Sequence, residues 1–235
     1  MLYIRLGPRE KNAHRLHIRP VAQSRRIKAN LNVANGIMQK ITNETILKIR
    51  KPTPRYPVLK EIEKRFSPRF FSDEMVSEMD LNSIFEAAQW APSAHNHQPW
   101  YFYYTKKGTN SYTNLFSTLN TYNQSWAHTA PLLILACAII TNEKGENPFA
   151  LYDLGASVIS LILQAQSLGY FARQMGLFDK EKVKRIFKLE KNLEPFIIIA
   201  LGKIGDYTSA PGTIVELELD PRPRKTDVAK ELIDK

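Results

Sequence analysis

Two basic side chains and one hydroxyl lie close together in the segment 65–71, with the sequence RFSPRFF. Arg65 and Arg69 flank Ser67, and each arginine presents a planar fork of donors that suits the oxygens of a phosphate. With the small hydroxyl donor of Ser67, this pair could bind a phosphate group. The alternative is a basic turn that is exposed to solvent and binds nothing, and the segment alone does not separate the two.

A second polar segment, residues 91–100 (APSAHNHQPW), is a proline-bounded loop that is rich in amides and imidazoles. Asn96 and Gln98 each offer a donor and an acceptor, which a site needs to recognise the edge of a planar heterocycle. His95 and His97 have no Cys, Asp or Glu in the same loop, so they lack a recognisable ligand set for a metal. We expect no metal site, and an ordinary polar loop is the alternative to a ligand-binding one.

Periodic apolar residues predict the elements that position these two segments. We expect helices over 58–65, 73–90 and 152–170, and strands over 100–104, 132–140 and 196–201. The helix over 152–170 is apolar around much of its circumference, so we expect it to be buried on all sides, in part against a second copy of the chain. These elements predict an α+β fold, with helices packed on a sheet, and a homodimer.

The order and spacing of these segments resemble the FMN-dependent nitroreductase family. R-x-S-x-R-x-F at 65–71 is followed by A-P-S-x-x-N-x-Q-P-W at 91–100. Later segments are also similar to the family, namely WAHTAPLLILAC at 126–137, YDLGASVISLILQAQSLGY at 152–170, RQMGLFD at 173–179 and PRPRK at 221–225. The resemblance covers residues 58–233. It implies a nitroreductase-like fold with a central, mostly antiparallel sheet flanked by helices and a long buried dimer helix.

The resemblance also implies which positions bind FMN. Residues 65–69 and the arginines of 221–225 match the positions that hold the phosphate and the ribityl chain. Residues 92–98 match a loop that passes along the isoalloxazine ring of the partner subunit, where Asn96 and Gln98 match the positions that bind the polar groups of the ring or the ribityl chain. Residues 174–176 match the segment whose main-chain amide points at the flavin N5. The implied cofactor-binding residues are Arg65, Phe66, Ser67, Arg69, Pro92, Ser93, Ala94, Asn96, Gln98, Gln174, Met175, Gly176, Arg222 and Arg224.

The activity that the resemblance implies consists of two half-reactions at one site. NADH or NADPH gives hydride to FMN and leaves, and an electron-poor small molecule such as a nitroaromatic compound or a quinone then takes its place. No catalytic side chain is assigned. One alternative is a family member with another redox task, such as reductive dehalogenation, flavin fragmentation or peptide dehydrogenation. An alternative from another class is a basic nucleic-acid-binding protein.

The net charge of +10 is concentrated near the N-terminus. Residues 1–37 hold eight Lys and Arg against one acid, whereas the chain from Arg69 onward is close to neutral, which disfavours nucleic-acid binding by the main body. We expect residues 1–56 to be a basic, disordered segment and residues 57–235 to be the FMN-binding domain. A natural start at Met38 and an organelle transit peptide are alternatives for the N-terminal segment.

The apolar runs and the cysteine content bear on the compartment. No run approaches the roughly 18 apolar residues that a membrane-spanning helix needs, so we expect no membrane association. Cys137 is the single cysteine, so the chain forms no internal disulfide. A reducing compartment fits best, and we expect the protein in the cytoplasm.

Overall fold

The structure is a computed structural model that describes residues 41–143, 145–220, 222–225 and 228–232. Residues 39–222 form one unit, and the residues from Pro223 onward belong to a second unit. The described residues of this second unit contain neither helix nor strand. The predicted disorder of residues 1–40 falls outside the described part of the chain.

An antiparallel sheet lies at the centre of the first unit, with the strand order β1-β2-β6-β5. Its strands are β1 (Trp100–Lys106), β2 (Leu132–Ile139), β5 (Phe171–Met175) and β6 (Leu193–Gly202). Successive side chains of a strand point to opposite faces, and those of β2 are buried on both, which explains its unbroken apolar sequence. The α+β fold with a mostly antiparallel central sheet is confirmed.

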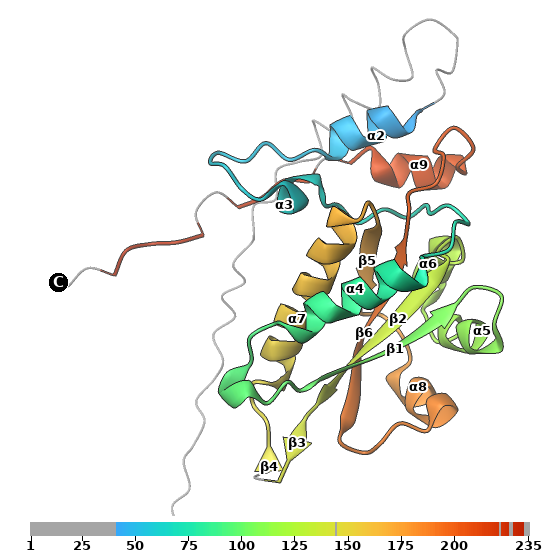
Figure 1. The fold of residues 1–235 in the computed structure, drawn as a ribbon. Helices are drawn as coiled ribbons and strands as arrows, with labels where there is room; N and C mark the ends of the chain where they lie inside the picture. Colours follow the sequence, from blue (N-terminus) through green and yellow to red (C-terminus); the bar gives the residue numbers. More distant parts are fainter. Residues whose placement is uncertain (1–40, 144, 221, 226–227, 233–235) are drawn as a thin grey trace, which may run out of the picture. The chain divides into compact units, whose positions relative to one another are not determined.

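Two helices, α4 (Glu78–Gln89) and α7 (Ala150–Ser167), pack against one another over this sheet, as Figure 1 shows. The hydroxyl of Ser77 accepts the main-chain N–H of Asp80 and so caps the start of α4. Ser157 of α7 donates a buried hydrogen bond of 2.8 Å to the carbonyl oxygen of Ala88. This polar contact fixes how α4 and α7 pack on each other.

Shorter elements complete the unit. None of the helices in the described part of the chain is long and apolar enough to cross a membrane. The shorter elements are α2 (Asn43–Arg50), α3 (Lys60–Lys64), the 3-10 turn η1 (Ala94–Asn96), α5 (Asn110–Phe116), α6 (Thr121–Ala127), β3 (Thr141–Asn142), β4 (Gly145–Glu146), α8 (Lys180–Phe187) and α9 (Gly212–Glu218).

Helix α2 lies before the domain boundary that the sequence predicts at residue 57. Its Ile46 side chain is fully buried, and Asn43 Oδ1 accepts the main-chain N–H of Tyr207 at 2.8 Å. The proline-rich stretch 52–57 is therefore a connection between two packed helices and not the start of the domain. The expectation of a disordered segment up to residue 56 is corrected for residues 43–50, which form α2.

Helix α7 is not buried on all sides, in contrast to the expectation from its sequence. Tyr152 is 80% exposed and Ile159 is 43% exposed, and Gly155 and Ala156 lie between them on the same side of the helix. We call these four residues the open α7 stripe. The opposite side of α7, which includes Leu161, is buried within the chain itself. A single copy of the chain thus leaves an apolar strip of its longest helix uncovered.

Candidate functional site

Two arginines gather around one buried carboxylate, Glu218 at the end of α9. Arg50 Nη2 lies 2.8 Å from Glu218 Oε2, and Arg69 Nη1 lies 3.3 Å from Glu218 Oε1. The main-chain N–H of Arg69 donates to the same Oε1 at 2.9 Å. The Glu218 side chain is 0% exposed, and those of Arg50 and Arg69 are 10% and 14% exposed. This network joins α2, α9 and the segment 65–71.

A third guanidinium, that of Arg173 on β5, extends this group. Its Nη1 donates to the carbonyl oxygen of Ser67 at 2.6 Å, and the guanidinium lies 5.1 Å from the ring centre of Trp126. Burial, followed by the charge of Arg69, lowers the pKa of Arg173 to about 10. Desolvation and a like charge both act against a cation, and the charge of Glu218 acts in the opposite direction. We call Arg50, Arg69, Arg173 and Glu218 the arginine cluster.

Several polar atoms in or beside this cluster are buried without a hydrogen-bond partner. Among the described residues they include the Nε atoms of Arg50 and Arg69 and the hydroxyl of Tyr207. Buried donors nearly always have partners, so an unpaired group points to a missing ligand or water. With three guanidiniums and one carboxylate, the cluster carries an excess of two positive charges, and its donors suit a multiply charged anion.

The remaining basic residues of the predicted phosphate site are placed differently. Arg222 donates to the carbonyl oxygens of Arg50, at 2.8 Å from Nε, and of Arg65, at 2.6 Å from Nη1. The observed role of Arg222 is therefore to join the ends of α2 and α3. Arg224 is exposed and belongs to the second unit, where it donates to Pro223 O at 3.0 Å. Its expected contact with a phosphate stays a prediction.

Phe66 is a core residue. Its side chain is 1% exposed, and its ring meets that of Phe171 at 5.1 Å between centres in an edge-to-face arrangement. This contact holds the segment 65–71 against the start of β5. The side chain of Phe66 therefore positions its neighbours Arg65 and Ser67 and is itself covered.

The loop at 92–98 has a strained backbone. His95, Asn96 and Gln98 have φ values of 52°, 58° and 47°, a region that costs about 1–3 kcal/mol for residues other than glycine. The side chains of these three residues are exposed, and Gln98 Nε2 donates to the Asn96 carbonyl oxygen at 3.2 Å. Strain of this kind persists where surrounding contacts enforce it, and it is typical of ligand-binding loops.

Two hydrogen bonds enforce this loop conformation. Ser93 Oγ accepts the main-chain N–H of Gln98 at 3.0 Å. The buried carboxylate of Asp153 accepts the N–H of Ala94 at 3.1 Å, and Pro92 beside it is exposed.

Within the described part of the chain, no group of three His, Cys, Asp or Glu side chains could hold a metal.

The end of β5 presents the other predicted segment. Gln174 is exposed and Met175 is buried in the core. Gly176 is exposed, and a Cβ there would meet only Ile197 Cδ1, at the ordinary contact distance of 3.8 Å. Packing within the chain therefore does not require a glycine, and the main chain at 176 is left open on one side.

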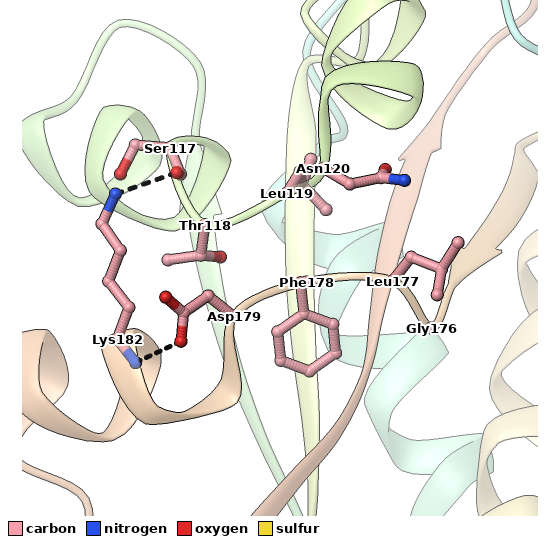
Figure 2. Close-up of a pocket in the computed structure, with 9 residues that line it drawn as sticks. All are labelled: Ser117, Thr118, Leu119, Asn120, Gly176, Leu177, Phe178, Asp179 and Lys182. Carbon is pink, nitrogen blue, oxygen red and sulfur yellow. Dashed lines mark hydrogen bonds between the residues drawn. The ribbon is translucent and has the colours of Figure 1, made fainter.

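A pocket of about 490 Å³ borders Gly176, between residues 117–120 and 176–179 (Figure 2). The two loops are tied together, since Asn120 N–H donates to Leu177 O at 3.2 Å and Asp179 N–H donates to Thr118 O at 2.8 Å. Lys182 Nζ closes one side through the Ser117 carbonyl oxygen at 3.0 Å. A volume of this size lies in the range of small-molecule sites.

The loop 92–98 and the arginine cluster lie near opposite ends of α7. Asp153, which holds the loop, is in the first turn of α7, whereas Arg173 comes after the C-terminal end of the helix. An α-helix rises about 1.5 Å per residue, so the two ends of this 18-residue helix lie roughly 25 Å apart. One chain therefore brings residues 65–69 together with Phe171 and Arg173 of β5, and holds residues 92–98 at the other end of α7.

Three of the four residues in the arginine cluster were not predicted from the sequence, namely Arg50, Arg173 and Glu218. Arg173 directly precedes the predicted segment 174–176, so its position was a usable signal. Arg50 and Glu218 are 168 residues apart, and neither lies in a recognisable motif. Their pairing could be found only from the structure, because no local pattern connects them.

Comparisons with known proteins agree with this architecture. The Nitroreductase family matches residues 62–203, which is more than half of the chain. A 15.4 kDa protein of Mycolicibacterium smegmatis is 36% identical over 114 residues, which are 48% of this chain and 76% of that protein. A protein of Archaeoglobus fulgidus named "Putative NADH dehydrogenase/NAD(P)H nitroreductase" is 28% identical over 148 residues, which are 61% of this chain and 83% of that protein.

A solved structure of an oxidoreductase containing FMN is also similar. It has a TM-score of 0.70 at 32% identity, and the match covers 76% of this chain and 93% of that one. The match to the family extends from α3 to the start of the loop after β6, so it includes the whole central sheet and the segment that carries Arg65, Ser67 and Arg69. By sequence and by fold, this chain belongs to the nitroreductase family of enzymes.

Proposed function

We propose that the chain is an FMN-dependent oxidoreductase that oxidises NADH or NADPH and reduces an electron-poor acceptor such as a nitroaromatic compound or a quinone. The observation that carries the proposal is the arginine cluster. Its excess of two positive charges lies beside Ser67, and a phosphate monoester carries a charge of about −1.5 to −2 near pH 7. The donor set therefore fits the phosphate end of FMN in charge and in chemistry.

The residues around the cluster would hold the phosphate. Ser67 and Arg69 would donate to its oxygens, and Arg65 would add a further guanidinium from the same segment. Charge-assisted hydrogen bonds of this kind are worth about 1.5–3 kcal/mol each. The buried Nε atoms without partners on Arg50 and Arg69 support this role, because the protein itself does not saturate these arginines.

The ring would lie along the open main chain that follows β5. Gly176 comes three residues after Arg173, so a ligand held by its phosphate at the cluster extends naturally toward Gly176 and the adjoining pocket. Bound FMN supplies the hydride chemistry in both half-reactions. The chain would hold its phosphate and orient its ring through main-chain groups near Gly176.

We propose that the working form is a homodimer. The open α7 stripe supports this, because it exposes apolar side chains of the longest helix. The separation between the arginine cluster and the loop 92–98 supports it as well. In a two-fold dimer, the loop of one copy could reach the flavin held by the other, which would bring Asn96 and Gln98 to the ring.

The decisive measurement is the absorbance of the purified protein together with its FMN content. We expect a yellow protein that releases about one FMN per chain and oxidises NADH or NADPH when a quinone or nitroaromatic compound is present. Arg69→Ala should weaken FMN binding by roughly one to two orders of magnitude, whereas Arg185→Ala, an exposed site on α8, should not. A colourless protein that does not bind added FMN would refute the proposal.

A further inference from the structure

We propose that Glu218 is a positioning residue that holds Arg50 and Arg69 in place for the cofactor phosphate, and that it thereby makes flavin affinity depend on that phosphate. The inference rests on the proposed function and goes beyond it. Glu218 and Arg50 both lie outside residues 62–203, the part of the chain that matches the family. The family match therefore assigns neither residue a role.

The contacts of Glu218 fix Arg69 at two points. Oε1 accepts both the main-chain N–H of Arg69, at 2.9 Å, and its guanidinium, at 3.3 Å. The carbonyl oxygen of Leu217 accepts from the same guanidinium at 3.4 Å and from Arg50 at 2.6 Å. The end of α9 thus sets both the backbone and the side-chain direction of Arg69, and with them the position of Ser67 two residues earlier.

Glu218 also separates charges that would otherwise repel. The pKa of Arg173 is already lowered, first by burial and then by the charge of Arg69. Glu218 is the carboxylate that the described structure places between Arg50 and Arg69, at 2.8 Å and 3.3 Å from their nitrogens. Without its charge, three guanidiniums would share a poorly hydrated space and would move apart.

Burial decides whether Glu218 supports a phosphate or competes with it. The carboxylate is fully covered, whereas the side chains of Arg50 and Arg69 retain some exposure. A phosphate that arrives from solvent therefore meets the arginines and not the carboxylate. One negative charge also offsets only one of three positive charges, so the remaining excess still attracts a dianion. Glu218 accordingly acts as a fixed support on the covered side of the arginines.

The test compares the dissociation constants of FMN and riboflavin, which differ by the phosphate group. Both are measured by flavin fluorescence at constant ionic strength for the full chain and for Glu218→Gln. We expect Glu218→Gln to weaken FMN binding about tenfold or more, the loss of one charged hydrogen bond, and to leave riboflavin binding unchanged. Glu216→Gln, an exposed position on the same helix, is the matched control and should change neither.

A double-mutant cycle shows whether Glu218 acts through Arg69. In an Arg69→Gln background, Glu218→Gln should weaken FMN binding less than it does in the parent, because one of the two side chains that it positions is gone and only Arg50 remains. Tighter FMN binding by Glu218→Gln would overturn the proposal, since it would make Glu218 a competitor. Equal weakening of FMN and riboflavin would also overturn it, because that result indicates a general structural role.

Two further outcomes distinguish a failure of this inference from a failure of the proposed function and from misfolding of the variant. A parent protein that binds neither flavin refutes the proposed function itself, whereas a parent that binds FMN beside an unaffected Glu218→Gln variant refutes only this inference. Melting curves report whether Glu218→Gln is folded. Glu218→Asp retains the negative charge on a shorter side chain and provides a second test. Its ratio of FMN affinity to riboflavin affinity should fall below that of the parent. An unchanged ratio contradicts the positioning role.

Discussion

Replacing Ile159 with Glu tests whether the open α7 stripe is a subunit interface. Complete burial of an isoleucine side chain is worth about 1.5–3 kcal/mol, so covering the 43% that remains exposed would contribute about 0.6–1.3 kcal/mol per subunit. Burying a glutamate carboxylate instead costs several kcal/mol, and a two-fold dimer carries the change twice. A total loss of about 5 kcal/mol raises the dissociation constant of the dimer by more than about 1000-fold.

Sedimentation equilibrium at micromolar concentration, combined with flavin absorbance, is the assay. We expect the parent to be a flavin-bound dimer and Ile159→Glu to be a folded monomer that has lost FMN. Asn114→Glu, at an exposed position on α5, is the control for added charge. Leu161 is unsuitable for this test, because its side chain is fully buried within one chain and a charge there would disrupt the fold. A dimeric, flavin-bound Ile159→Glu variant would refute the reasoning.

Three further predictions concern single side chains. Ile46→Ala should lower the free energy of unfolding by about 2–4 kcal/mol in urea denaturation, because a fully buried side chain is truncated; a loss below about 0.5 kcal/mol would show that α2 is not part of the core. Asp153→Ala leaves the Ala94 N–H without its acceptor, so it should cost about 1–3 kcal/mol in the same assay and reduce FMN retention, and unchanged retention would speak against a role of the loop. Burial, with a smaller effect of Glu194, raises the pKa of Cys137 from 9.0 to about 12, so iodoacetamide at pH 9 should modify the folded protein far more slowly than the denatured one. Since the folded thiol keeps its proton where the unfolded thiol loses it, the contribution of Cys137 to the free energy of unfolding should fall as pH rises from about 9 to about 12, and rapid native alkylation would contradict this.

The elements that could be predicted from the sequence are those with a strong pattern of their own. The apolar run of β2 and the periodicity of α4 and α7 each arise from one buried face, and all three elements lie close to their expected positions. β5 was not predicted, because its five residues (FARQM) alternate weakly and depend on pairing with β6. α2 was not predicted because it buries little besides Ile46, whose partners come from distant parts of the chain.

In the candidate site, too, local patterns could be predicted from the sequence and long-range pairings could not. The spacing of Arg65, Ser67 and Arg69 is a local property, and the structure places the carbonyl of Ser67 and the side chain of Arg69 in or beside one cluster. The partners of Arg69 were not predictable, because the ion pair with Glu218 joins residues that are far apart in sequence. Arg222 is expected at the phosphate, and that contact stays a prediction. In the structure it donates to main-chain carbonyls, since helix ends offer unpaired acceptors that a guanidinium can satisfy.

The distance between the strained loop and the arginine cluster has a genetic consequence. In the proposed dimer, each site takes its cluster from one subunit and its loop from the other. A subunit with a defective cluster and a subunit with a defective loop are both inactive as homodimers, yet their hybrid contains one site built entirely from intact parts. Random mixing of the two inactive proteins should therefore restore about a quarter of the wild-type number of sites. Two alleles of one gene could then complement each other in the same cell.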